Sequence, residues 1–225
     1  QSVLSTSVAD VLIVDNASSD RSLDTLVEPD PRLRIIRNQS NDGFAGGINR
    51  GFRETNSQYV LILNPDAKAK PGAVASLKSV LDENPKAGVV GGFVNERYLP
   101  RPLPTVWRLL LENLGFSPSK HARNVLGPVR VQQPAASALM VRREAFNAVG
   151  GFDEQFYPAW YEDVDFSTAV ADAGWEAFYD PRAKFDHVGG HTCRLLGTER
   201  FIMAYYTNQF RYVRKHFSSG PIFSL

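Results

Sequence analysis

Short runs of β-branched and aliphatic residues alternate with helix-forming segments through the first 94 residues, and this alternation limits the fold more than any other feature. The runs end in turn-forming residues, as in Asp-Asn-Ala-Ser and Asn-Pro-Asp. We expect strands at 10–15, 32–38, 59–67 and 87–94, with helices from about Asp20, at 44–55 and at 71–84. This order is typical of a mostly parallel, doubly wound α/β sheet, which binds ligands beyond the carboxyl ends of its strands.

The remainder of the chain is less regular. Prolines surround one amphipathic stretch, 105–116, and we expect residues 95–130 to form an insertion or flap. Segments 135–146 and 177–188, with an acidic helix beginning near Glu162 between them, are expected to complete a mixed sheet. A length of 225 residues suits a single domain over 1–225.

Composition excludes several classes of function. The 25 basic and 24 acidic side chains nearly cancel, so no overall charge favours nucleic acid as a partner. The single cysteine, Cys193, allows neither an intrachain disulfide nor a cysteine-rich metal site, which fits a reducing compartment. No apolar run is long enough to span a bilayer, and we expect a cytoplasmic protein.

Six motifs carry a resemblance to a known family. In chain order they are VDNASSD, GFAGGINRG, LNPDA, MVRREAF with VGGFDE, YEDVDF and DHVGGHT. In content and order these motifs resemble family 2 glycosyltransferases, and they look most similar to the bacterial rhamnosyltransferase-like branch. The resemblance covers nearly the whole chain. It implies a GT-A fold, a nucleotide-sugar donor, and Mg²⁺ or Mn²⁺ as cofactor.

The resemblance assigns the metal to Asp66 and His187. A nucleotide sugar has a diphosphate leaving group, whose charge a divalent cation held by oxygen ligands can neutralise. Asp66 corresponds to the metal ligand of the DxD-type motif, and Asn64 at its first position would bind the ribose or a metal-bound water. His187 matches the late histidine ligand, and His191 is its competitor. Taken alone, Asn-Pro-Asp is more often simply a turn, and only its neighbouring motifs favour the metal ligand. A lone histidine is likewise more often a packed or surface residue.

The donor is expected to contact the first strand and the helix at 44–55. By resemblance Asp15 recognises the nucleotide base, beside Asn16 in a turn that Asp20 would extend into a helix cap. Asn49 would face the nucleotide or pyrophosphate, and nearby glycines would let the backbone approach it. Close packing of the helix on the sheet explains the glycines equally well.

The stretch FYPAWYEDVDF places aromatic residues before three carboxylates. The carboxylates fall in the first turn of a helix, whose dipole favours their ionised forms. By resemblance Asp163 is the base that removes the acceptor's proton, with Glu162 orienting the acceptor. Trp160 and Tyr161 would offer flat faces to a sugar or a lipid-linked acceptor. The alternative is that the carboxylates stabilise the helix and the aromatics belong to the core.

In one respect the chain departs from the family. Members normally open with a further strand and helix, whereas this chain begins at Gln-Ser-Val-Leu. We therefore expect it to be incomplete at its N-terminus relative to the family, without the usual first strand and helix. An edge of the sheet would then be exposed, and one wall of the nucleotide pocket would be missing.

The resemblance implies an inverting glycosyltransferase of cell-surface polysaccharide synthesis. It would move a sugar, with rhamnose the leading candidate, from a dTDP- or UDP-sugar to a saccharide or polyprenyl-linked acceptor. The basic end of the last helix, at 211–215, fits either peripheral contact with the inner face of the cell membrane or a solvated helix terminus. A noncatalytic nucleotide- or sugar-binding relative is the main alternative. A sugar-phosphate nucleotidyltransferase is less favoured, because the chain lacks a basic, glycine-rich loop near its start.

Overall fold

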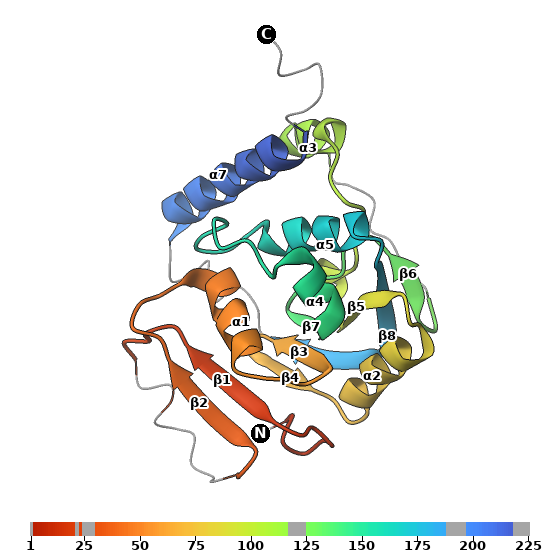
Figure 1. Ribbon diagram of the computed structural model, residues 1–225. Helices are drawn as coiled ribbons and strands as arrows, with labels where there is room; N and C mark the ends of the chain where they lie inside the picture. Colours follow the sequence, from red (N-terminus) through yellow and green to blue (C-terminus); the bar gives the residue numbers. More distant parts are fainter. Residues whose placement is uncertain (1, 21–22, 24–29, 117–124, 188–196, 218–225) are drawn as a thin grey trace.

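The computed structural model describes residues 2–20, 23, 30–116, 125–187 and 197–217 (Figure 1). Its strands form two separate sheets. A two-stranded parallel sheet pairs β1 (Val11–Asp15) with β2 (Leu33–Arg37). A six-stranded sheet has the order β3-β7-β5-β8-β4, with β6 pairing with β8. Its strands are β3 (Tyr59–Leu63), β4 (Ala67–Ala69), β5 (Ala87–Phe93), β6 (Val129–Val131), β7 (Ala138–Arg142) and β8 (Glu176–His187).

The larger sheet is mixed, and the expectation of a mostly parallel sheet is wrong for the described strands. Only β5 and β8 run parallel there, and every other pair is antiparallel. The reason is β7, which enters between β3 and β5 in the opposite direction after a long irregular connection. Alternation of strands and helices cannot reveal such an insertion.

Helices cover both faces of the larger sheet. The described helices are α1 (Gly43–Arg53), α2 (Ala73–Glu83), α3 (Val106–Asn113), α4 (Arg143–Val149), α5 (Glu162–Asp172) and α7 (Thr198–Phe217), with a 3₁₀ turn, η2 (Glu96–Tyr98). α1, α4 and α5 pack on one face of the sheet and α2 on the other. In Figure 1, α3 and α7 lie side by side at the top, and α5 lies between them and the sheet. The helix expected from about Asp20 falls mostly on residues outside the described part of the chain.

Three apolar clusters hold these layers together. One lies under α1, α4 and α5, where Phe52 stacks on Phe146 with ring centroids 3.6 Å apart. A second lies under α2 and includes Leu77 and Phe185. The third joins α3, α5 and α7 through residues such as Tyr212. Burial of these faces stabilises the fold mainly by removing apolar surface from water.

One edge of the larger sheet collects several strand ends. Because β3 and β5 are both antiparallel to β7, and β5 is parallel to β8, the carboxyl ends of β3, β5 and β8 meet the amino end of β7 there. The expected strand at 59–67 divides at this edge. It stops at Leu63, turns through Asn64-Pro65-Asp66, and resumes as β4. The turn therefore places its polar side chains beside His187.

Candidate functional site

Asp66 and His187 lie in direct contact at this edge. The Oδ1 atom of Asp66 is 2.8 Å from Nε2 of His187, whose side chain is only 4% exposed. The Nδ2 atom of Asn64 is 3.4 Å from the same ring nitrogen. The expected convergence of the Asn-Pro-Asp turn and the end of the last strand is therefore present. The competing histidine, His191, lies outside the described residues.

The geometry of this pair fits a divalent cation. Adjacent ligands of an octahedral Mg²⁺, each about 2.1 Å from the ion, are about 3 Å apart, close to the separation of the Asp66 oxygen and the His187 nitrogen. The His187 ring also packs against the ring of Tyr98 in η2, with the ring centroids 5.3 Å apart. In the described part of the chain, no three His, Cys, Asp or Glu side chains gather into one metal site. Of the described residues, Asp66 and His187 would hold such a cation.

Glu162 and Asp163 open α5 as a pair of carboxylates. Glu162 is 6% exposed, and its Oε2 atom makes no hydrogen bond to the described residues. Burial, reinforced by the charge of Asp163, raises the pKa of Glu162 well above its ordinary value of 4.5. Burial also raises the pKa of Asp163 above 3.8, while backbone N–H groups of Val164 and Ala136 and the Arg101 guanidinium oppose the rise.

These differences assign different protonation states to the two acids. Two adjacent carboxylates at a buried site cannot both ionise cheaply. Asp163 accepts a 2.8 Å hydrogen bond from the backbone N–H of Val164 and faces the positive end of the helix dipole. At Glu162 a backbone N–H also lowers the pKa, but this is the smallest of the effects on that group, and Oε2 makes no hydrogen bond to the described residues. Asp163 is therefore the better stabilised carboxylate of the two, and Glu162 is the acid that more readily keeps a proton.

Two consecutive residues connect the carboxylate pair to the Asp66–His187 pair. The backbone N–H of Ala136 bonds to Asp163, and the carbonyl of Ser137 accepts from the backbone N–H of Asn64 at 3.1 Å. The hydroxyl of Ser137 is buried without a partner among the described residues. The amino end of β7 therefore holds the two pairs beside each other at one edge of the sheet.

Two further polar residues, Gln133 and Arg101, lie near Asp163, and neither was predicted from the sequence. Gln133 places Nε2 3.4 Å from Oδ2 of Asp163, and its backbone pairs with Arg101 through hydrogen bonds of 3.0 and 3.1 Å. Both residues lie in or beside the segment expected as a flap. No local signal marks them, because they are about 30 and 60 positions away from Asp163.

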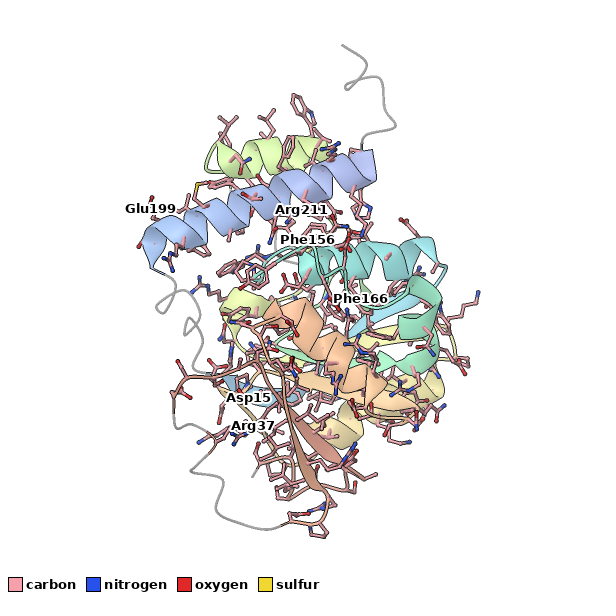
Figure 2. The ribbon with its side chains drawn as sticks, turned by 60° about the vertical axis from the view of Figure 1, so that its left-hand side comes forward. Asp15, Arg37, Phe156, Phe166, Glu199 and Arg211 are labelled. Atoms are coloured by element: carbon pink, nitrogen blue, oxygen red, sulfur yellow. The ribbon has the colours of Figure 1, made fainter. Side chains whose placement is uncertain are left out.

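Of the two residues at the end of β1 that were expected to contact the donor, Asn16 is engaged in hydrogen bonds within the protein. Hydrogen bonds from the side chain and backbone of Ser18 hold the pKa of Asp15 below 3.8, so this buried carboxylate is ionised. Asn16 donates to the carbonyl of Gly43 at 2.7 Å and accepts from Asn38 at 2.8 Å. Figure 2 shows Asp15 beside Arg37 at the end of the small sheet. Asp15 remains available to recognise a base, whereas Asn16 ties β1 to α1 and β2.

Asn49 has a structural role in place of the expected donor contact. It is 8% exposed, donates to the carbonyl of Phe152 and to Glu154, and accepts from the N–H of Phe152, all within 2.9 Å. A Cβ atom at Gly151 would come within 2.8 Å of its Oδ1, and φ there is +89°, so this turn needs glycine. The Asn49 amide is therefore engaged by the Gly-Gly-Phe-Asp-Glu turn and does not face a nucleotide-sugar donor.

The two aromatic residues before α5 also differ from each other. Tyr161 is 6% exposed, accepts a hydrogen bond at its hydroxyl from Gln209 of α7, and packs against Tyr205 and Tyr212. Its ring has no face open to a saccharide, so it is not retained as an acceptor contact. Trp160 is half-buried and packs edge-on against Phe201 at 4.8 Å, and it remains a candidate.

Comparison with known proteins places these features in context. Residues 1–150 match glycosyl transferase family 2. The chain is 28% identical to N-acetylglucosaminyl-diphospho-decaprenol L-rhamnosyltransferase of Mycobacterium tuberculosis, across 81% of this chain and 67% of the relative. It is 27% identical to low-salt glycan biosynthesis hexosyltransferase Agl10 of Haloferax volcanii, across 71% of this chain and 52% of the relative.

Solved structures agree on the fold. GalNAc-T7, crystallised with UDP, GalNAc and Mn²⁺, superposes with a TM-score of 0.71 at 14% identity, covering 95% of this chain and 44% of that one. The mannosyltransferase PcManGT from Pyrobaculum calidifontis, in complex with GDP-Man and Mn²⁺, gives a TM-score of 0.64 at 18% identity, covering 94% and 55%. The chain thus spans about half the length of these structures. They confirm the expected GT-A fold, a mixed α/β sheet flanked by helices.

The family match covers well over half of the chain and includes β1, the Asn-Pro-Asp turn and β7. It confirms the resemblance carried by the motifs in this part of the sequence. The chain belongs to glycosyl transferase family 2.

Proposed function

We propose that this chain is an inverting, metal-dependent glycosyltransferase. The observation that supports this most is the meeting of two kinds of group at one sheet edge: the Asp66–His187 pair and the Asp163 carboxyl group. The first pair suits a cation that binds a nucleotide diphosphate. The second group suits removal of a proton from an attacking hydroxyl. Transfer of a sugar from a nucleotide sugar needs both.

On the donor side, Asp66 and His187 would hold Mg²⁺ or Mn²⁺, with Asn64 bonding to the ribose or to metal-bound water. When bound, such a cation supplies neutralisation of the negative charge that develops on the diphosphate leaving group. Asp15, ionised and at the end of β1, would accept a hydrogen bond from the base. The donor would therefore lie across the ends of β1 and β3.

On the acceptor side, Asp163 takes the proton of the acceptor hydroxyl as its oxygen attacks the anomeric carbon. The proton moves to the carboxylate, the new C–O bond forms, and the bond to the diphosphate breaks. A raised pKa makes Asp163 a stronger base while hydrogen bonds and Arg101 keep it ionised. Activity should therefore fall on the acidic side as pH drops through this raised pKa. Protonated Glu162 would donate a hydrogen bond to a neighbouring acceptor oxygen.

The proposed substrates are chosen by analogy with the relatives. One acts as an N-acetylglucosaminyl-diphospho-decaprenol L-rhamnosyltransferase, which favours a dTDP- or UDP-sugar, with rhamnose first, and a saccharide or polyprenyl-linked acceptor. Another is a poly-beta-1,6-N-acetyl-D-glucosamine synthase of Staphylococcus epidermidis, 24% identical across 77% of this chain. These names support a proposed role in cell-surface polysaccharide synthesis. The location that we propose is the cytoplasm, or the periphery of the membrane at its inner face.

The decisive experiment is single-turnover transfer at saturating donor. Asp163→Asn should cut transfer by about a hundredfold or more while donor affinity stays unchanged, because a base acts only on the chemical step. Glu162→Gln should be milder. Asp172→Asn is the matched control, since Asp172 is exposed in the last turn of the same helix. Near-normal transfer by Asp163→Asn would remove this residue from the mechanism, and binding of donor without any turnover would favour the noncatalytic alternative.

A further inference from the structure

α3 presents its apolar stripe to solvent. Trp107, Leu110, Leu111 and Leu114 follow the i, i+3, i+4, i+7 spacing that normally faces a core. Here they are 71%, 44%, 45% and 66% exposed, and only Leu109 of this helix is buried. The described residues therefore leave this apolar face partly to largely open to solvent.

α7 packs inward through Tyr205, Tyr212 and Val213, yet it also exposes an apolar face. Its buried residues are Asn208, Gln209 and Tyr212. Asn208 donates to the carbonyls of Ala159 and Trp160 at 2.9 and 3.0 Å, so its amide is satisfied inside the protein. The opposite face exposes Ile202, Met203, Tyr206 and Phe210. Two amides and several aromatic side chains thus face inward, while a second set of large apolar side chains faces outward.

The two faces belong to one surface. Asn113 of α3 bonds to Gln209 of α7 at 2.9 Å, and Leu109 packs in the same cluster as Tyr212. Figure 2 shows the two helices lying side by side, with side chains of α3 projecting away from the body of the protein. We call the eight exposed residues of both helices the α3–α7 face: Trp107, Leu110, Leu111, Leu114, Ile202, Met203, Tyr206 and Phe210.

Basic residues accompany this face. The two helices contain five Arg and Lys residues against two Glu, in a chain whose net charge is only +1. Arg108, Arg200 and Arg214 are exposed on these helices. Large apolar and aromatic residues flanked by arginine are the composition of helices that lie in the interface of an anionic bilayer. None of the described helices is both long and apolar enough to cross a membrane.

We propose that the α3–α7 face docks on an anionic phospholipid surface, with both helices lying flat in the head-group region. A second copy is less suitable, because a twofold contact would bring the same basic residues toward one another. The inference rests on the proposed function in one respect, since a polyprenyl-linked acceptor can be reached only at a bilayer. Arg101 links the two sites physically, because it faces Asp163 and pairs with Glu112 of α3 at 3.9 Å.

The first test is co-sedimentation with vesicles, without donor or acceptor. The chain should bind vesicles that contain phosphatidylglycerol more tightly than vesicles of phosphatidylcholine alone, and salt should weaken the binding. Leu110→Glu with Phe210→Glu should lower partitioning by at least about tenfold. Leu126→Glu is the matched control, because Leu126 is 94% exposed outside this face. Equal loss in the control, or no vesicle binding by the parent, would overturn the proposal.

A second readout locates the contact. Trp107 is 71% exposed, so its emission should shift to the blue when anionic vesicles are added. Trp107→Phe should lose that shift yet still sediment with vesicles. Concentration-dependent dimers in light scattering, abolished by the double variant, would instead assign the face to a second copy.

Failure of this proposal can be told apart from failure of the proposed function. Slow hydrolysis of a nucleotide sugar in solution tests the donor site alone, and the double variant should keep it. Vesicle binding lost with hydrolysis intact supports the surface assignment. Absence of vesicle binding in a parent that transfers sugar refutes the surface and leaves the function standing.

Discussion

Glu162 offers a test of the charge assignment at the scale of one residue. Its folded pKa lies above 4.5, so above that pH the folded protein keeps a proton that the unfolded chain has lost. The parent's stability should therefore fall as pH rises from 4.5 through the raised pKa. The side chain introduced by Glu162→Gln does not titrate. The free energy of unfolding of this variant should therefore increase relative to that of the parent as pH rises to neutrality.

Urea unfolding at both ends of this pH range measures the effect. Glu144→Gln is the control, since Glu144 is an exposed acid in the first turn of α4. A difference between Glu162→Gln and the parent that does not change with pH would show that Glu162 is ionised in the folded protein, and the assignment of its proton would fall.

The Asp66–His187 pair makes a second prediction at this scale. Asp66→Ala should abolish Mn²⁺-dependent binding of a nucleoside diphosphate, and His187→Ala should weaken Mn²⁺ affinity by at least about tenfold. Calorimetric titration of Mn²⁺ in the presence of the nucleotide measures both. Asp186→Ala serves as control, because Asp186 is adjacent but exposed and pairs with Lys70. A larger loss in His191→Ala would transfer the ligand role to that histidine.

Among the structural elements, α1 depends on a contact with a turn far away in the chain. Asn49→Ala would leave the buried N–H and carbonyl of Phe152 without their side-chain partner, which should cost about 2–3 kcal/mol of unfolding free energy. Nucleotide affinity below the unfolding transition should stay at the parent's value. Arg53→Ala, exposed in the last turn of α1, is the control. A selective loss of nucleotide affinity would restore Asn49 to the donor site.

What sequence could predict differs between these elements for physical reasons. The meeting of Asp66 with His187 is predictable, because carboxyl ends of parallel strands share an edge. The antiparallel insertion of β7 between β3 and β5 is not predictable, because the pairing of strands depends on contacts between residues far apart in sequence. Asn49 and Tyr161 look functional by residue type, yet their polar atoms are satisfied by groups 103 and 48 positions away. The outward stripe of α3 has the same spacing as an inward one.

At the scale of the whole molecule, the two sheets should differ in local stability. Among the described strands, β1 pairs only with β2, and both are largely half-buried or exposed, whereas β5 is almost wholly buried. A two-stranded sheet is marginal by itself. Backbone amides of β1 and β2 should therefore exchange with solvent through local opening, well before those of β5, which require global unfolding.

Nucleotide binding should couple the two sheets, because the proposed donor site joins Asp15 of β1 to Asp66 after β3. Hydrogen exchange followed by mass spectrometry should show slower exchange in β1 when a nucleoside diphosphate and Mn²⁺ are added together. Asp66→Ala should remove this protection although Asp66 lies on the other sheet, since without the cation the diphosphate loses its anchor. Protection of β1 that persists in Asp66→Ala would mean that the small sheet binds the nucleotide by itself. The donor would then not span the two sheets, and the assignment of Asp15 and Asp66 to one site would fail.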